Sequence, residues 1–123
     1  MSEKHNFFAD NNAEKQIDSK KVAALNDKLR KTFQGGQVMM TRGIQALDAD
    51  MVGNILDAVR RADNFNADND PYGEHDFGSV LVEGNKCFWK IDYYDKQLQY
   101  HSQDKSDPNV TTRVLTIMLA EEY

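Results

Sequence analysis

Cysteine, proline and long apolar runs are scarce in this sequence of 123 residues. Its one cysteine, Cys87, excludes an internal disulfide and a metal cluster built from several cysteines, and it fits a reducing compartment. No apolar run approaches the roughly 20 residues that a membrane-spanning helix needs. The first residues, Met1 to His5, lack the basic start and apolar block of a secretory signal. We therefore expect a cytoplasmic protein without an integral membrane segment.

Positive charge is also in short supply, and the shortage is local. The net charge of the chain is −5. Residues 1–35 hold seven Lys or Arg against five Asp or Glu, whereas residues 36–123 hold eight against fifteen. An acidic body is a poor match for the phosphate backbone, because binding to nucleic acid depends on neutralising phosphates with Lys and Arg. We therefore expect a protein partner and no direct binding to nucleic acid.

The order of apolar and turn-forming residues predicts one α+β domain over residues 18–123, preceded by a flexible arm over residues 1–17. Apolar positions spaced by three and four predict helices, and alternating runs bounded by Gly, Asn or Asp predict strands. We expect a small antiparallel sheet of three to five strands packed by about three helices. The helices are predicted over residues 19–34, 48–63 and 108–121, and the strands over residues 37–42, 77–82, 86–94 and, as a short edge strand, 98–101.

The helix predicted over residues 19–34 is amphipathic. Its apolar stripe includes Leu25 and Leu29, which lie four residues apart. Lys28, Arg30 and Lys31 occupy other positions around the helix. We interpret this basic side as an outer face of the helix that is in contact with solvent.

The segment from Val110 to Leu119 is open to two interpretations. It is rich in β-branched residues, which favours a strand. Asp107 and Pro108, however, are a typical N-cap and first-turn pair, and the apolar residues that follow fit one face of a helix. We favour a largely buried helix.

The predicted strand over residues 86–94 has two different faces, because successive side chains of a strand point to opposite sides. One face is apolar and is expected to lie in the core, with Cys87 as a small buried hydrophobe rather than a nucleophile. That face consists of Cys87, Trp89, Ile91 and Tyr93. The other face alternates aromatic and charged side chains, so we expect it to be partly solvated or covered by a partner. It consists of Phe88, Lys90, Asp92 and Tyr94.

Three blocks in the C-terminal half carry a resemblance to a known family. They read Asn-Asp-Pro-Tyr-Gly-Glu-His-Asp-Phe-Gly over residues 69–78, Phe-Trp-Lys-Ile-Asp-Tyr-Tyr-Asp over residues 88–95, and Thr-Arg-Val-Leu-Thr-Ile-Met-Leu-Ala-Glu-Glu-Tyr over residues 112–123. From about Leu25 to its last residue, the chain resembles a mostly proteobacterial domain-of-unknown-function family, number thirty-seven sixty-eight. The resemblance implies a gene that is often carried on plasmids and other mobile elements. It implies no established activity.

Two histidines outside the predicted arm offer an enzymatic alternative. His75 and His101, together with Glu74 and Asp92 or Asp95, would supply the two imidazoles and one carboxylate that leave a catalytic position open on a metal. A small metal-dependent hydrolase of this kind would activate water. The spacing contains no helical metal-binding motif, and the acidic loop fits neither register of an EF-hand that we tested. We therefore predict no catalytic residue, metal or cofactor.

The favoured hypothesis is a non-enzymatic protein-binding module. Clustered carboxylates steer a basic partner, and tyrosines are common interface anchors. Given the resemblance, we expect the partner to be a host protein that handles nucleic acid or acts in defence, while a homodimer through the solvated sheet face stays open. The predicted binding surface consists of Asp68, Asp70, Tyr72, Glu74, His75, Asp76, Phe88, Lys90, Asp92, Tyr94 and Asp95.

Overall fold

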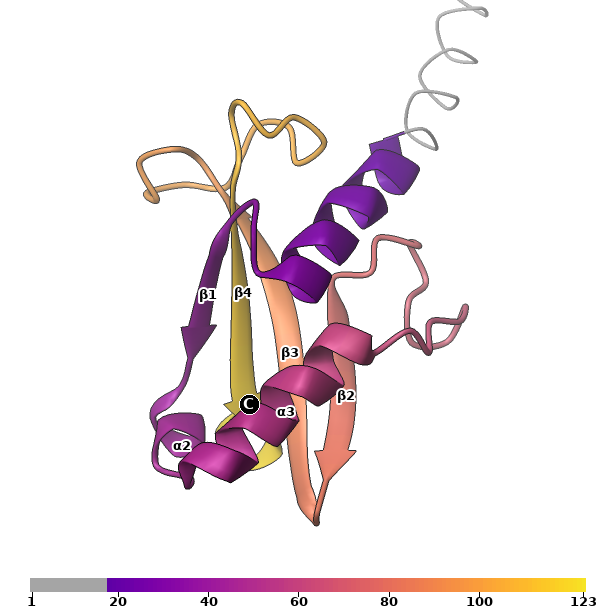
Figure 1. Ribbon diagram of the computed structural model, residues 1–123. Helices are drawn as coiled ribbons and strands as arrows, with labels where there is room; N and C mark the ends of the chain where they lie inside the picture. The colour runs from indigo at the N-terminus through magenta and orange to yellow at the C-terminus, as the bar shows by residue number, and fades with distance from the viewer. Residues whose placement is uncertain (1–17) are drawn as a thin grey trace, which may run out of the picture.

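The computed structural model describes residues 18–123, so the arm predicted over residues 1–17 lies outside the described residues. The first described element is a helix over residues 18–32 (Figure 1). The elements that follow confirm the α+β class. They are β1 (Gln37–Met40), α2 (Arg42–Gln45), α3 (Ala49–Arg61), β2 (Phe77–Val82), β3 (Asn85–Tyr94), β4 (Thr112–Leu119) and the 3-10 turn η1 (Ala120–Glu122).

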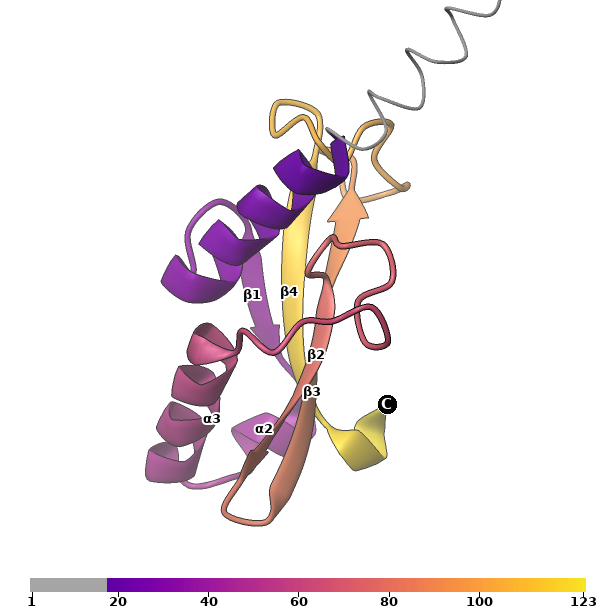
Figure 2. The same cartoon turned by 90° about the vertical axis from the view of Figure 1, so that its right-hand side faces the viewer.

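The sheet has four strands in the order β1-β4-β3-β2. The predicted hairpin is confirmed as the antiparallel pair β2–β3, and β3 is also antiparallel to β4. The sheet is mixed rather than wholly antiparallel, because β1 runs parallel to β4. Parallel neighbours need a long connection between them, and here the connection contains α2, α3 and the β2–β3 hairpin. In Figure 2, helix 18–32 and α3 lie on one side of the sheet.

The prediction of a helix over residues 108–121 is wrong. Thr112–Leu119 forms β4, the strand that pairs with both β1 and β3. Asp107 and Pro108 belong to a turn, in which the Asp107 side chain accepts a hydrogen bond from the backbone N–H of Asn109 at 2.9 Å. A central strand that is buried on both faces has a continuous apolar run, and such a run resembles a buried helix.

Residues 98–101, predicted as a short edge strand, form a turn with a single β-bridge between His101 and Tyr94. The start of α3 agrees with its prediction, since the Asp48 side chain accepts from the Met51 N–H at 2.8 Å. Helix α2 was not predicted. Its first turn is held by Glu122 of the C-terminal turn, whose carboxylate accepts from the Gly43 N–H at 2.9 Å.

The core lies between the inner face of the sheet and the helices. Cys87 and Trp89 are fully buried there, which confirms their predicted side of the strand. The Trp89 ring lies against Gly78 of the neighbouring strand, where a Cβ atom would come within 2.6 Å of the ring. Glycine at this position therefore allows the tryptophan to pack flat under β2. The buried residues of this cluster are Leu29, Ile44, Ile55, Val59, Cys87, Trp89, Ile91, Leu115 and Ile117.

The prediction that Arg30 lies on a solvated face is wrong, because its side chain is 0% exposed. Its guanidinium donates to the carbonyls of Val59, Arg60 and Ala62 at the C-terminal end of α3. It also forms an ion pair with Asp27, one turn earlier, at 3.0 Å. Carbonyls at a helix C-terminus lack partners within the helix and attract positive charge, so Arg30 joins helix 18–32 to α3.

Candidate functional site

The predicted binding residues fall into two separate groups. Those of residues 68–76 belong mainly to the connection between α3 and β2, whereas those of residues 88–94 lie on β3. The first group turns mostly inward and the second turns away from the helices. The two groups therefore have different roles.

Glu74 is buried and serves the fold. Its carbonyl accepts from the Asn26 side chain at 3.0 Å, and its carboxylate forms an ion pair with Lys105 at 2.7 Å. Asn26 also donates to the Tyr93 hydroxyl at 2.7 Å and accepts from the Arg113 Nε at 2.9 Å. These polar groups connect helix 18–32 to the sheet and to the loop between β3 and β4, which contains Lys105. Burial raises the pKa of the Tyr93 phenol, so this hydroxyl stays neutral.

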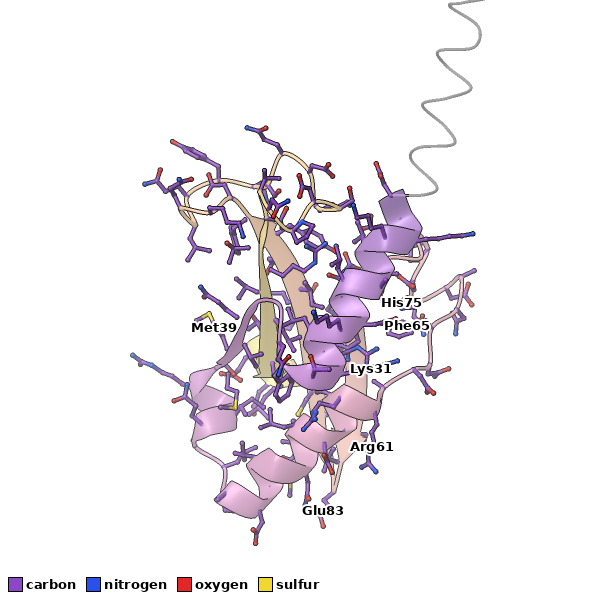
Figure 3. The ribbon with its side chains drawn as sticks, turned by 45° about the horizontal axis from the view of Figure 1, so that its top comes forward. Lys31, Met39, Arg61, Phe65, His75 and Glu83 are labelled. Atoms are coloured by element: carbon purple, nitrogen blue, oxygen red, sulfur yellow. The ribbon has the colours of Figure 1, made fainter. Side chains whose placement is uncertain are left out.

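His75 is likewise used inside the molecule. Its Nδ1 lies 2.9 Å from the Asp27 carboxylate, and its Nε2 lies 3.5 Å from Asp70. The imidazole stacks on the Phe65 ring at a centroid distance of 4.0 Å. Both residues are labelled in Figure 3. The Asp70 side chain is only 6% exposed. His75 and Asp70 thus hold the loop against helix 18–32 and offer little surface to a partner.

Asp68 and Tyr72 do reach solvent, and Tyr72 is 80% exposed. Tyr72 stands at the wall of a polar hollow of about 410 Å³, opposite Lys105. The hollow contains the Lys105–Glu74 ion pair described above, and Asp18 and Asp104 add two further carboxylates to its lining.

The residues of the metal alternative are divided between different partners. Asp92 forms an ion pair with Lys90 at 3.2 Å, and the His101 ring is stacked with the Tyr94 ring at a centroid distance of 6.4 Å. His75 is engaged with Asp27 and Asp70, as described above. Within residues 18–123, no group of three or more His, Cys, Asp or Glu side chains is placed to hold a metal ion.

Asp76 differs from its neighbours because its carboxylate accepts no hydrogen bond from another residue of the described chain. It is partly buried, and its backbone carbonyl accepts from the Ile91 N–H at 2.8 Å. Burial, followed by repulsion from Glu74 and then from Asp70, raises the pKa of Asp76 above its ordinary value.

We expect Asp76→Asn to increase the free energy of unfolding at pH 7. A carboxyl whose pKa is higher in the folded than in the unfolded state stabilises the fold below its unfolded pKa, near 3.8, and loses that contribution as the pH rises. Urea unfolding at pH 7 and at pH 3 measures the difference, which should shrink at the lower pH. Asp68→Asn, at an exposed position of the same loop, is the control. A variant less stable than wild type at pH 7 would show that the carboxylate has a stabilising partner.

The second group of predicted residues lies on the side of the sheet opposite helix 18–32 and α3, which we call the open face (Figure 2). Strand register places alternate residues of all four strands on this side. Phe88, Lys90, Asp92 and Tyr94 all belong to it, as the alternation in the sequence predicted. The open face consists of Gln37, Met39, Phe77, Ser79, Leu81, Lys86, Phe88, Lys90, Asp92, Tyr94, Thr112, Val114, Thr116 and Met118.

An aromatic cluster occupies one end of the open face. The centroids of the Phe77 and Phe88 rings lie 5.4 Å apart, and the centroid of the Tyr123 ring lies 5.6 Å from that of Phe77 and 5.2 Å from that of Phe88. Tyr123 nevertheless remains 73% exposed. Sequence reasoning missed both Phe77 and Tyr123. The period-two pattern of residues 77–82 would have assigned Phe77 to this face, whereas nothing local places Tyr123 there.

A groove of about 360 Å³ occupies the other end of the open face. Met39 and Leu98 line it beside Tyr94 and are 54% and 46% exposed. Leu98 reaches this position from the turn after β3, in which the Asp95 carboxylate accepts from the backbone of Gln97 and Gln99. Asp95 therefore shapes the turn that brings Leu98 to the groove.

Charge is sparse on the open face. Its charged side chains are Lys86, Lys90 and Asp92, of which Lys90 and Asp92 form an ion pair at 3.2 Å. The net charge of this face is therefore +1 in a chain whose net charge is −5. The open face is thus mainly aromatic and apolar, whereas exposed carboxylates of the predicted acidic surface lie in the loop before β2.

No helix among the described residues combines the length and the apolar character needed to cross a membrane. Comparison with curated proteins and comparison with solved structures each find no match. A family model matches residues 40–122, which contain the three blocks that carry the resemblance apart from Tyr123. The matched residues include β2, β3 and β4, the last residue of β1, and every residue of the predicted binding surface. The chain therefore belongs to the family described as Protein of unknown function (DUF3768).

Proposed function

We propose that this protein is a non-enzymatic binding module that contacts another protein through the open face of its sheet. The observation that carries the proposal is the combination of aromatic, methionine and leucine side chains with few charges, the Lys90–Asp92 ion pair and Lys86, on the side of the sheet away from helix 18–32 and α3. The centres of protein interfaces are poor in charge and rich in aromatic residues and methionine. Soluble monomers seldom leave such a surface without a partner.

The chemistry of the partner follows from the charge of the whole chain. A protein with a net charge of −5 steers a basic surface toward itself and repels acidic ones. Proteins that handle nucleic acid have basic surfaces, and the family resemblance adds an association with mobile elements. We therefore propose a basic host protein of nucleic-acid handling or defence as the partner.

The groove supplies the test of this function. Met39→Arg combined with Leu98→Arg places two cations where a basic partner would dock and removes two exposed apolar contacts. We expect capture of the partner from a bacterial lysate to fall at least tenfold, which corresponds to about 1.4 kcal/mol of binding free energy. Quantitative mass spectrometry of the captured proteins measures the loss for each protein.

The matched control adds the same two side chains on the helical side of the molecule. Ala24 and Asn54 are exposed on helix 18–32 and α3, so Ala24→Arg with Asn54→Arg changes the net charge equally. This control is expected to retain every partner that the wild-type protein captures. Equal loss in both double variants, or no loss in either, would contradict binding through the open face.

A further inference from the structure

Strand β2 forms one edge of the sheet and lacks the usual protection of an edge strand (Figure 1). Its six residues read Phe-Gly-Ser-Val-Leu-Val and contain neither a charge nor a proline. Natural proteins normally protect such edges with lysine, proline or bulges, because a bare edge pairs with any extended chain. Leu81, in this strand, is 72% exposed.

The register of the hairpin shows which backbone groups of β2 point outward. The Ile91 N–H donates to the Asp76 carbonyl, so these opposed residues form a hydrogen-bonded pair. Hydrogen-bonded and non-hydrogen-bonded pairs alternate along an antiparallel ladder. The N–H and C=O groups of Phe77, Ser79 and Leu81 therefore point away from β3, toward the free edge.

A pocket of about 120 Å³ lies beside the first half of this edge. Phe65, Asn64 and Asn69 contribute to its walls, and Gly78 and Trp89 line it from the sheet. The Trp89 Nε1 is buried and has no hydrogen-bond acceptor among residues 18–123. It lies 2.7 Å from the position that a Cβ atom would occupy on Gly78, directly beside the edge backbone. A buried donor without an acceptor is costly, so an acceptor brought by a ligand would find a partner here.

The charges around the edge select the kind of ligand. Exposed Asp63 and Asp68 belong to the loop that forms the pocket wall, and exposed Glu83 follows the other end of β2. Two-fold pairing of β2 with a second copy would bring the Glu83 end of one chain to the acidic loop of the other. Such contacts repel, whereas an extended chain with a cation at each end is attracted.

We propose that the β2 edge is a second binding site, which takes an extended segment of another protein as a fifth strand. The segment has an uncharged, β-branched centre, Lys or Arg at its ends, and one side chain that accepts a hydrogen bond from the Trp89 Nε1. Strand addition of this type derives affinity from the backbone and specificity from a side-chain pocket. The site uses backbone groups of the edge and does not depend on the open face.

The test starts from selection of a phage-displayed random peptide library on the full-length protein. We expect enriched peptides with basic ends around a β-branched centre. Binding of the synthetic selected peptide is then compared between wild type, Ser79→Pro and Ser79→Thr. Proline at position 79 removes an outward N–H and leaves the hydrogen bonds of the 78–89 and 80–87 pairs, a position at which an edge strand tolerates it. Threonine keeps the donor.

We expect Ser79→Pro to weaken binding at least tenfold and Ser79→Thr to change it less than twofold. Glu83→Lys serves as a second variant that leaves the strand intact, and it should weaken binding of the same peptide. Binding should also slow amide hydrogen exchange at Phe77, Ser79 and Leu81. Failure to enrich any peptide, equal binding to Ser79→Pro, or a dimer of the free protein formed through β2 would overturn the proposal.

Discussion

Replacing Arg30 with alanine is expected to lower the free energy of unfolding by about 3–5 kcal/mol. The side chain is fully buried, and its guanidinium satisfies the carbonyls of Val59, Arg60 and Ala62. It also packs over the rings of Phe65 and Trp89, at 5.4 and 5.2 Å from their centroids. The substitution removes these contacts together, opens a cavity, and takes the guanidinium donor away from all three carbonyls, of which only that of Val59 also accepts from the Ala62 N–H.

Urea unfolding followed by the fluorescence of Trp89, the one tryptophan of the chain, measures this loss. Lys31→Ala is the control, because Lys31 is the next residue of the same helix and is exposed. Its effect should stay within about 0.5 kcal/mol. Arg30→Lys should recover only part of the stability, since an ammonium cannot reproduce the planar fork of donors. If Arg30→Ala and Lys31→Ala unfold alike, the description of Arg30 as the connection between two helices is wrong.

Asn26→Leu is expected to destabilise the fold by about 2–4 kcal/mol, although leucine has a similar volume. The amide joins three groups that are distant in sequence, namely the Glu74 carbonyl, the Tyr93 hydroxyl and the Arg113 Nε. Leucine leaves all three in a buried region without their partner, and each such group contributes a desolvation penalty of roughly 1–3 kcal/mol.

The same unfolding measurement applies to this variant, with Lys28→Ala as an exposed control on helix 18–32. A double-mutant cycle with Tyr93→Phe isolates one bond of the network, because it separates the Asn26–Tyr93 term from the rest. Additive effects of the two substitutions would show that this hydrogen bond contributes nothing to stability.

The buried contacts of Asn26 and Arg30 extend the folded unit beyond the residues that the family model matches. The match begins at residue 40, whereas both side chains belong to helix 18–32. Their partners, which include Glu74, Tyr93 and Arg113, lie inside the matched region. Helix 18–32 is therefore a structural part of the same fold.

Local patterns predicted the hairpin well, because its information lies within short stretches of sequence. Residues 77–94 alternate around a Gly84 turn, and this alternation placed Cys87 and Trp89 in the core and Phe88 and Lys90 on the opposite face. The start of α3 at Asp48 was equally predictable from the sequence, because a capping side chain accepts from the backbone N–H only three residues later.

Strand β4 was mistaken for a helix because its burial on both faces depends on segments that are distant in the sequence. Val114 and Met118 are buried on the open face, while Leu115 and Ile117 are buried on the other face in the core cluster that includes Leu29 and Ile55 of the helices. A strand of this kind loses the alternation by which strands are recognised.

The polar residues of the predicted site could not be assigned from sequence for a related reason. His75 lies 48 residues from Asp27, and nothing in the neighbourhood of either residue indicates that the two pair. In this acidic, histidine-containing loop, Asp70, Glu74 and His75 contact other parts of the fold, and no local pattern separates them from the exposed Asp68 and Tyr72. Met39 and Leu98 were missed because the groove forms only when β1 and the turn after β3 meet across the sheet.

Site-specific photo-crosslinking in cells tests binding through the open face most directly. A photoreactive benzoylphenylalanine is introduced at Met39, on the open face, and separately at Ala24, on the helical side. Both positions are exposed, so the two proteins differ only in the face that presents the reactive group. We predict a discrete covalent adduct with another protein from position 39 and none from position 24. Adducts from position 24 alone, or identical adducts from both positions, would contradict the open face as the binding surface.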